Sequence, residues 1–202
     1  SSDCRPLAST MAPAEVHQRR AVSVLPSATE MLCFIGGGDR LVGRSHEDNY
    51  PKEITHLPVL TGQRTTFTTC GDVDKQVSAA LSSGKSLYTL NVQLLKELKP
   101  DVILTQDICS VCAIDLPTVE RVAAELDPSP QVVSLNPQSL EDVLSNITQV
   151  GDAVGMQEEA AAALAGLRDR LGAVDERVAA WRARGGAGDA GGPSVAFVEW
   201  PE

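Results

Sequence analysis

The chain has 202 residues, of which 43% are hydrophobic and 22% are charged, and its formal net charge is -10. This balance is typical of about one globular domain with a core of its own, and the lack of a basic patch argues against nucleic acid as the main partner. No apolar run approaches the roughly 18 residues of a membrane-spanning helix, so no membrane span is predicted. Five cysteines at modest density exclude a small disulfide-stabilised scaffold.

Residues 1–20 contain neither an apolar segment nor a helical periodicity, and we expect them to be a disordered leader. The stretch does not begin with Met. It is interpreted either as what a removed targeting peptide left behind or as the end of a cloned fragment. The sequence therefore leaves the compartment unknown, and an organelle lumen is one option if the leader is a processed remnant.

A strand, a sharp turn and a helix are predicted after this leader. Residues 21–25 form an apolar, β-branched run that stops at Pro26, and Ser27 and Glu30 have the S-x-x-E spacing of a helix capping box. We expect the helix to begin at Ser27, with Glu30 acting as a cap rather than as a ligand. The backbone N–H groups of Ser27 and Ala28 at this helix start suit an anionic substituent.

Two polar loops are predicted to lie side by side. Residues 41–43 predict a second short strand, and the loop that leaves its end contains His46. Residues 57–61 are a third short apolar run, followed by a loop with Gln63 and Arg64. His46 is interpreted either as an axial ligand to a metal or as a hydrogen-bonding loop residue, which is the commoner role of a lone histidine. Loops at the carboxyl ends of parallel strands are where ligands bind.

Strands and helices alternate through the middle of the chain. The clearest central strand is residues 101–106, which are continuous and β-branched, and residues 131–136 repeat the signal. Asn91, Asp115 and Ser139 are each predicted to cap a helix. The expected helices cover residues 72–82, 91–99, 115–127 and 139–154. The expected fold class is α/β, with a Rossmann-like parallel sheet and flanking helices.

The loop after the central strand carries reactive side chains. Asp107 opens it, and Cys109 and Cys112 form a C-x-x-C motif at the predicted edge of the cleft. The spacing permits a disulfide, a thiolate pair for a soft metal or two buried thiols, whereas a four-cysteine zinc site would need a second pair that the sequence does not supply. A thioredoxin-like redox role would need the motif at a helix start in a different βαβ context.

The last predicted helix, residues 156–184, has an apolar seam three heptads long. The seam consists of Leu164, Leu167, Leu171, Val174, Val178 and Trp181. We expect one long rod whose seam packs on the sheet of this chain, and the alternative is a coiled-coil partner. Residues 185–193 predict a flexible linker, and residues 194–202 predict one more strand.

Five motifs follow one another in unbroken order: VSVLPSATE, RLVGRSHEDNYP, LPVLTGQR, LLKELKPDVILTQDICSVCA and the terminal VAFVEW. In these motifs the chain resembles the amino-terminal lobe of the cobalamin-type and iron-siderophore-type solute-binding proteins of ABC importers. The resemblance implies two α/β lobes joined by a long helix, with a metal chelate such as a corrinoid, haem or ferric siderophore held between them. Residues 21–155 would form the ligand-binding lobe, 156–184 the connecting helix, and 194–202 the first strand of a second lobe that is missing or only begun.

The resemblance also implies roles for single residues. Tyr50 stands where the loop of the family presents an aromatic ring to a flat macrocycle, and Trp200 is the other suitably placed aromatic residue. Similar C-x-x-C loops in related proteins favour a family feature for Cys109 and Cys112. Docking to the importer uses one acidic residue per lobe, and the matching position here is Gln93, whose neutral side chain departs from that pattern.

The expected function is non-catalytic binding of a metal chelate, with no required cofactor, in a periplasmic or other extracytoplasmic protein that works with ABC-importer membrane subunits. The alternative is a repurposed lobe that acts as an accessory or scaffold subunit of a larger assembly, which the neutral Gln93 and the aromatic content of 3% favour. A third hypothesis is a thiol oxidoreductase that uses the cysteine pair. No Ser, His and Asp arrangement, phosphate loop or catalytic acidic pair can be assembled, so no enzyme is predicted.

Overall fold

The computed structural model describes residues 18–82, 86–108, 114–186 and 196. Its centre is a parallel four-stranded sheet in the order β2-β1-β5-β6. The strands are β1 (Ala21–Ser23), β2 (Leu41–Gly43), β5 (Val102–Thr105) and β6 (Gln131–Ser134). The predicted α/β class is confirmed, and the central strand predicted over residues 101–106 is β5, whose four residues are all buried.

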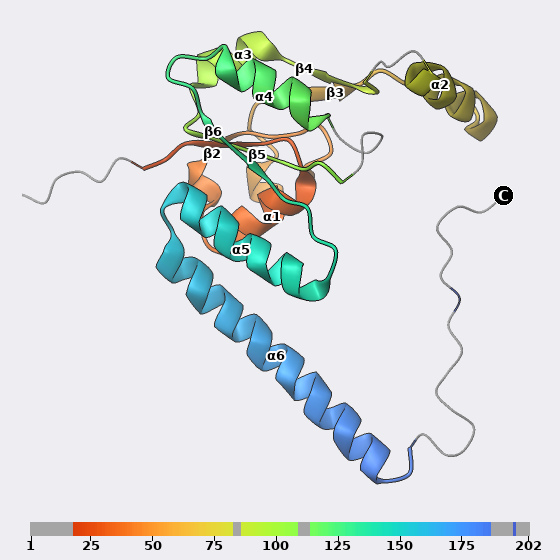
Figure 1. The fold of residues 1–202 in the computed structure, drawn as a ribbon, viewed down its shortest axis with the longest axis vertical. Coiled ribbons are helices and arrows are strands. Elements are labelled where there is room, and N and C mark those ends of the chain that lie inside the picture. The colour runs from red at the N-terminus through yellow and green to blue at the C-terminus, as the bar shows by residue number, and fades with distance from the viewer. Residues whose placement is uncertain (1–17, 83–85, 109–113, 187–195, 197–202) are drawn as a thin grey trace, which may run out of the picture.

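Helices cover both faces of this sheet (Figure 1). One face carries α1 (Pro26–Phe34) and α5 (Leu140–Val154), with α6 (Gln157–Ala183) packed on α5, and the other carries α3 (Val92–Leu98) and α4 (Leu116–Ala124). Two 3-10 turns, η1 (Gly38–Arg40) and η2 (Lys52–Ile54), lie in the connections. Side chains of β5 alternate between the two cores, because Leu104 packs with the α1 and α5 side while Ile103 packs with the α4 side. Covering on both faces explains why the central strands are apolar throughout.

The predicted helix caps at Asn91, Asp115 and Ser139 are confirmed. In each helix the side-chain oxygen of the cap accepts a hydrogen bond from the backbone N–H three residues later, at 3.0, 2.9 and 3.2 Å respectively. These caps are encoded locally, because the donor and the acceptor belong to the same turn of the chain.

The capping box predicted at the start of α1 is wrong. The helix begins at Pro26, its N-cap is Leu25, and no side chain caps it. Ser27 and Glu30 are both exposed. Proline is favourable at the first helical position, since its fixed φ suits the helix and its missing N–H has no partner there to lose. The helix therefore starts one residue before the S-x-x-E pattern predicts.

The third apolar run is displaced from its predicted position. Strand β3 covers Thr61–Gln63 and pairs antiparallel with β4 (Tyr88–Leu90), while Val59 makes only an isolated parallel bridge with Arg44. The predicted loop at Gln63 is thus part of a strand. The prediction failed because the partner of β3 lies 25 residues or so further along the chain, where no local pattern reveals the pairing.

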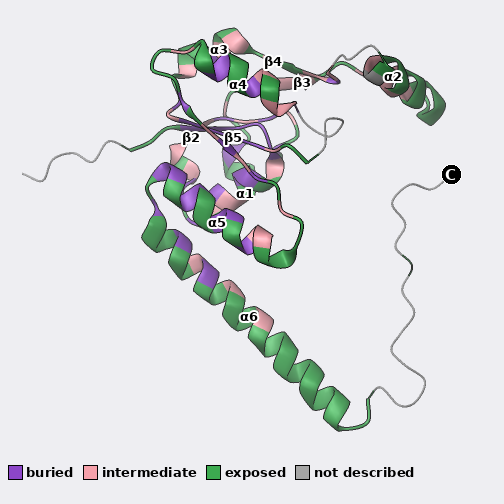
Figure 2. Ribbon diagram, viewed as in Figure 1, coloured by how far each residue is buried: buried purple, intermediate pink, exposed green. Residues whose placement is uncertain are grey.

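Helix α2 (Cys70–Ser82) lies between β3 and β4 and projects from the body of the lobe (Figure 1). It coincides closely with the helix predicted over residues 72–82. None of its described side chains is buried, and Figure 2 shows it without a buried surface. The side chain of Gln76 is one of its links to the preceding loop and bonds the backbone N–H and carbonyl of Thr66, each at 2.9 Å.

Helices α5 and α6 form an antiparallel hairpin around a close contact. Gly155 ends α5 with a φ of 73°, a conformation that glycine adopts readily. A Cβ atom added to Gly151 would lie 2.5 Å from the Cβ of Ala160, so the two helices approach closely only because residue 151 is a glycine. Leu140 is 57% exposed at the start of α5.

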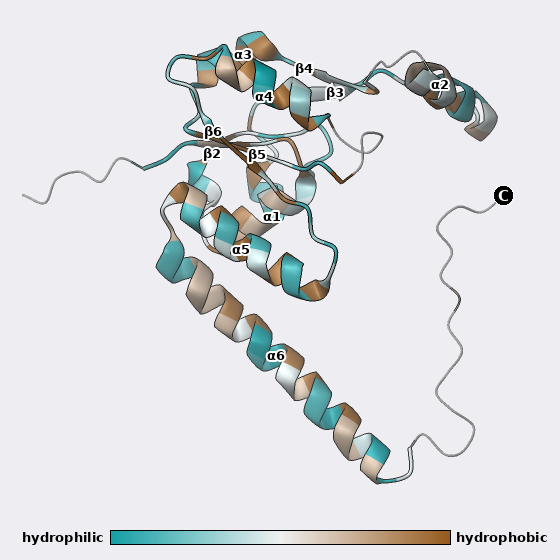
Figure 3. Cartoon of the chain, viewed as in Figure 1, coloured by the Kyte–Doolittle hydropathy of each residue, from teal (hydrophilic) through white to brown (hydrophobic). Residues whose placement is uncertain are grey.

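The apolar seam of α6 is buried over its first half only. Leu164 is buried and Leu167 packs against the core cluster that includes α5, whereas Val174, Val178 and Trp181 are exposed. Figure 2 shows the change from buried to exposed along the helix, and Figure 3 shows hydrophobic positions continuing to its far end. The expectation that the seam packs on the sheet is wrong, because α6 packs on α5, which has 15 residues against the 27 of α6 and, within the described part of the chain, faces only its first half.

The helix predicted at residues 156–184 is present as α6, whereas its role as a connector between lobes remains a prediction. The predicted leader and the predicted last strand lie almost wholly outside the described residues, as does most of the predicted linker. Across residues 18–82, 86–108 and 114–186, no helix combines the length and the apolar character that crossing a bilayer requires.

Candidate functional site

The loop after β2 is folded around the guanidinium group of Arg44. Its Nη1 donates to the carbonyl oxygens of Ser45 and Asp48, both at 3.1 Å, and its Nη2 donates to the carbonyl of Thr55 at 2.9 Å. Arginine suits this position because its planar group presents several donors in fixed directions. The entry and exit of the loop are thereby tied to one side chain.

The carboxylate of Asp48 ties the same loop to α1. Asp48 is 1% exposed, and its Oδ2 accepts hydrogen bonds from Thr29 Oγ1 at 2.5 Å and from the N–H of Ser45 at 3.1 Å. Burial raises the pKa of the carboxyl group, and the two hydrogen bonds and the charge of Arg44 oppose that rise only in part. Its second oxygen, Oδ1, is buried without a hydrogen-bond partner in the part of the chain that the structure describes.

His46 lies between this loop and β3. Its backbone N–H donates to Thr61 Oγ1 at 3.1 Å, and its Nδ1 lies 2.8 Å from the same hydroxyl. The ring packs at a tilt against Tyr88, with 5.8 Å between ring centroids. Within the described residues its Nε2 is buried and lacks a partner. This is the geometry of a hydrogen-bonding loop residue, and axial ligation to a metal stays a prediction.

Tyr50 is the exposed tip of the loop, with 66% of its surface accessible. It lines a groove of about 380 Å³ whose other walls come from α1, α5 and α6. The remaining lining residues are Glu30, Met31, Cys33, Phe34, Pro51, Val143, Ile147 and Leu167. Tyr50 therefore lies over the outer side of α1, and the other predicted ligand residues do not line this groove.

The start of α1 presents fewer backbone N–H donors to a ligand than the sequence predicted. The N–H of Ala28 donates to the carbonyl of Leu25 at 3.1 Å, and Ala28 itself is fully buried. Pro26 has no N–H, so neither of these two residues presents a backbone donor to a ligand. Ser27 is the exposed member of the predicted set at this helix start.

Gln63 and Arg64 lie on the β3–β4 pair. Both are exposed. Gln63 stands opposite Tyr88 in the antiparallel register, and Arg64 bonds the neighbouring strand through its N–H to the carbonyl of Leu87 at 2.8 Å and through Nε to the carbonyl of Tyr88 at 3.3 Å. The structure thus brings Arg64 to the backbone of Tyr88, the residue whose ring contacts His46.

Asp107 and Asn136 join the loops that leave the two neighbouring strands β5 and β6. The backbone N–H of Asp107 donates to Asn136 Oδ1 at 2.6 Å. The position is the carboxyl edge of the sheet, as predicted for Asp107. Asn136 did not stand out in the sequence, although its place at the end of the strand predicted over residues 131–136 was the available signal.

Gln93 is exposed on α3, and its Nε2 donates to Glu97 Oε1 at 2.9 Å. Cys109, Cys112 and Trp200 lie outside the described residues, so their predicted roles stay predictions. Of the described cysteines, Cys33 and Cys70 are free thiols, and burial together with nearby carboxylates raises the pKa of Cys33. Residues 18–82, 86–108 and 114–186 hold no group of three or more His, Cys, Asp or Glu side chains able to bind a metal ion.

Sequence reasoning missed the anchor of the Tyr50 loop. Thr29 and Asp48 are both buried, and neither was singled out. Asp48 lies in a run of polar residues that is typical of an exposed loop. Thr29 lies in a short helix whose hydrophobic residues show little helical periodicity. The available signal for this contact was a polar residue in each of two segments, α1 and the loop after β2, which follow the adjacent strands β1 and β2.

A family model described as periplasmic binding protein matches residues 22–187. The chain belongs to the periplasmic binding protein family. The family resemblance seen in the sequence motifs is therefore confirmed.

The periplasmic binding protein lobe has characterised structural neighbours. It superposes on a periplasmic heme binding protein from Pseudomonas aeruginosa with a TM-score of 0.57 and 22% identity, covering 83% of this chain and 49% of the other. It superposes on the periplasmic vitamin B12 binding protein BtuF of Vibrio cholerae with a TM-score of 0.56 and 20% identity, covering 80% and 51%. At these identities the neighbours show the fold.

A curated relative agrees with the family assignment. The chain is 24% identical over 160 residues to YvrC of Bacillus subtilis (strain 168), named as an uncharacterized ABC transporter substrate-binding lipoprotein, and the match covers 79% of this chain and 41% of YvrC. The chain thus spans about half the length, or less, of the relatives it matches.

Proposed function

We propose that this chain supplies one wall of a cleft that binds a metal chelate, such as a corrinoid, haem or ferric siderophore, in a solute-binding protein of an ABC importer. Membership in the periplasmic binding protein family supports the class, and two structural neighbours are named for binding heme and vitamin B12. The protein acts as an extracytoplasmic binder with no catalytic step, and it hands its ligand to the membrane subunits of the importer.

The single observation that carries the proposal is the presentation of Tyr50. Its ring is two-thirds exposed, while the loop that bears it is fixed by the buried Asp48 and by the guanidinium group of Arg44. An exposed aromatic ring on a rigid loop offers a large apolar face at low cost in side-chain entropy, which suits a flat macrocycle. Tyrosine adds a hydroxyl group that can bond a polar substituent.

Titration of the full-length protein tests this proposal. Haemin, cyanocobalamin and a ferric siderophore are each followed by absorbance and by calorimetry, and we expect saturable micromolar binding of one of them. Tyr50→Ala should weaken that binding about tenfold, as loss of an aromatic contact worth ~1.4 kcal/mol would. Tyr50→Phe should retain most of the affinity. Phe67→Ala is the matched control, because Phe67 is also an exposed aromatic residue but lies before α2.

Equal affinity of the wild type and Tyr50→Ala would remove Tyr50 from the site. Absence of saturable binding for all three chelates would reject the metal-chelate proposal. In that case the alternative of an accessory or scaffold subunit would be tested by isolating the complex that contains the protein.

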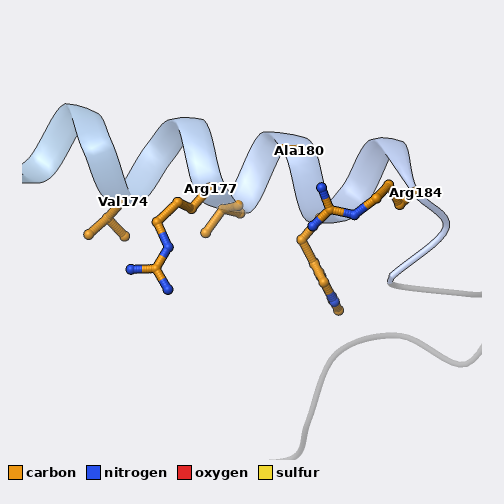
Figure 4. A pocket seen from close by; sticks show the side chains of 6 residues that line it. Val174, Arg177, Ala180 and Arg184 are labelled. Carbon is orange, nitrogen blue, oxygen red and sulfur yellow. The ribbon is translucent and has the colours of Figure 1, made fainter.

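The second half of α6 is proposed to contact a second α/β lobe. Val174, Val178 and Trp181 are exposed apolar residues, and Arg177 and Arg184 line the same surface; Val174 and Arg177 extend from one side of the helix (Figure 4). The matched relatives are about twice as long as this chain, which supports a second lobe as the covering element. Apolar surface of this kind is stabilised when it is removed from water.

Tryptophan fluorescence tests this contact. Residue 181 is the sole tryptophan of a fragment that ends at residue 186, and its signal in the full-length protein is the difference between wild type and Trp181→Phe. We expect emission at shorter wavelength and several-fold weaker acrylamide quenching in the full-length protein than in the fragment. Equal quenching in both would show that this half of α6 stays uncovered.

A further inference from the structure

The Tyr50 loop is attached to α1 by one buried carboxylate. Asp48 accepts a hydrogen bond from Thr29 on the helix and another from Ser45 in its own loop, at 2.5 and 3.1 Å. Thr29 is fully buried, so its hydroxyl reaches Asp48 in an environment without water. Hydrogen bonds to an ionised acceptor are stronger than neutral ones, and they are strongest where water is excluded.

Burial of the Asp48 carboxylate costs free energy. Taking a charge out of water is unfavourable, and the guanidinium group of Arg44 donates its hydrogen bonds to backbone carbonyls of the loop and not to the carboxylate of Asp48. Burial accordingly raises the pKa of Asp48. Two donors are nonetheless directed at its Oδ2, and through them the carboxylate joins the loop to α1.

The residue that Asp48 holds in place is Tyr50, the proposed contact to the ligand. Tyr50 follows it by two residues and is 66% exposed. The other end of the loop is held separately, through Arg44 to the carbonyl of Thr55. Arg44 also bonds the backbone carbonyl of Asp48, whereas the carboxylate of Asp48 attaches the loop to Thr29 on the first helix of the lobe.

We propose that Asp48 is a positioning residue, which holds the loop on Thr29 of α1 so that Tyr50 is presented to the ligand in one orientation. It does not touch the ligand, and it acts through Tyr50. The inference rests on the proposed function for its consequence, whereas the attachment of the loop can be measured without any ligand.

Hydrogen exchange measures the attachment directly. In the full-length protein, the amides of Ser45, Glu47 and Asp48 are compared with those of β5 in the wild type, Asp48→Asn, Thr29→Val and Thr29→Ser. We expect exchange of the loop amides to rise about tenfold in the first two variants, since Asp48→Asn weakens the buried hydrogen bonds by removing the charge of their acceptor and Thr29→Val removes one donor. Thr29→Ser keeps the hydroxyl and should restore wild-type exchange. Asp39→Asn is the control, because Asp39 is an exposed carboxylate on η1.

Unchanged exchange in Asp48→Asn and Thr29→Val would overturn the proposal. A rise that is equal in the loop and in β5 would also overturn it, because it would show that the variants weaken the whole fold. Valine nearly has the shape of threonine, so the effect of Thr29→Val reports the lost hydroxyl donor and not a cavity.

Ligand titration measures the consequence. Haemin and cyanocobalamin are titrated into the wild type, Asp48→Asn, Tyr50→Ala and the double variant. We expect Asp48→Asn to lose about tenfold in affinity in the wild-type background and to lose nothing further when Tyr50 is already alanine. A full additional loss in the double variant would show that Asp48 does not act through Tyr50, and would overturn the proposal.

The two proposals fail in different ways. If the wild type binds neither probe, the assignment of these ligands fails, and the hydrogen-exchange experiment still decides whether Asp48 holds the loop. If the wild type binds a probe and the exchange of the loop is insensitive to Asp48 and Thr29, the binding proposal stands and the positioning role is rejected.

Discussion

The two halves of α6 have the same apolar pattern and opposite surroundings. In the first half, Leu164 is 8% exposed against α5, while in the second half Val174 is 54% exposed. A periodic seam shows that one side of a helix is suited to burial, but the position of a neighbouring element decides whether it is buried. The difference separates residues that stabilise this lobe from residues that are free to contact something else.

The largest expected effect is at the packed half. Leu164→Ala should lower the free energy of unfolding by about 2–5 kcal/mol, because it removes buried methyl groups and leaves a cavity between α6 and α5. Urea denaturation monitored by circular dichroism measures the change. Leu164→Met, which nearly conserves volume, should cost less than about 1.5 kcal/mol. A loss below ~1 kcal/mol for the alanine variant would mean that this half is not packed as described.

The close contact of Gly151 in α5 with Ala160 in α6 gives the next largest expected change in stability. Gly151→Ala should destabilise by about 1–3 kcal/mol, because its new Cβ would lie 2.5 Å from Ala160 and would push α6 away. Gly166→Ala in α6 is the matched control, since no atom lies within 4 Å of its added Cβ and alanine favours a helix. Thermal unfolding should therefore move in opposite directions for the two variants, and a parallel shift would contradict the described packing.

A smaller effect on the free energy of unfolding is expected from pH, and it arises from the buried carboxyl group of Asp48 rather than from α5 and α6. Because the pKa of Asp48 is raised above about 3.9 in the folded protein, ionisation favours the unfolded chain. The stabilising contribution of the protonated Asp48 carboxyl group is fully present below the pKa that the group has in the unfolded chain. It is lost as the pH rises through the pKa that the group has in the folded protein. Thr29 and Ser45 as donors and Arg44 as a cation face it and oppose the rise, and the thiol of Cys33 lies near it.

Urea denaturation between pH 4 and 7 measures this contribution. Over this range the unfolding free energy of the wild type should fall relative to that of Asp48→Asn, in which the group cannot ionise. A wild type that instead gains stability relative to this variant as pH rises would mean that the pKa of Asp48 is lowered by its hydrogen bonds, and the cost assigned to its burial would be withdrawn.

The smallest effect is expected at the exposed half of α6. In a fragment of residues 18–186, Val174→Ala should change the unfolding free energy by less than ~0.5 kcal/mol, as is usual for surface substitutions. The same substitution in the full-length protein should cost distinctly more if a second lobe covers this surface. Equal small changes in both proteins would leave the second half of α6 without a structural partner.

The candidate site was only partly predictable. The loop after β2 and the strand-end position of Asp107 follow from the order of apolar and polar segments. The orientation of side chains within these loops does not, because it depends on contacts between distant segments. His46 lies under Thr61 and beside Tyr88, and Tyr50 lies over α1 away from the other predicted ligand residues. Neither placement has a local signal.

The sequence by itself determined the elements whose causes are local. The caps at Asn91, Asp115 and Ser139 and the continuous apolar strand β5 are fixed by residues within a few positions of one another, and together they specify the parallel α/β class. The tertiary structure decided which apolar surfaces are covered and which polar groups are buried. Half of the α6 seam is exposed and Asp48 is enclosed, because burial is a property of the neighbours that the fold brings in from elsewhere in the chain.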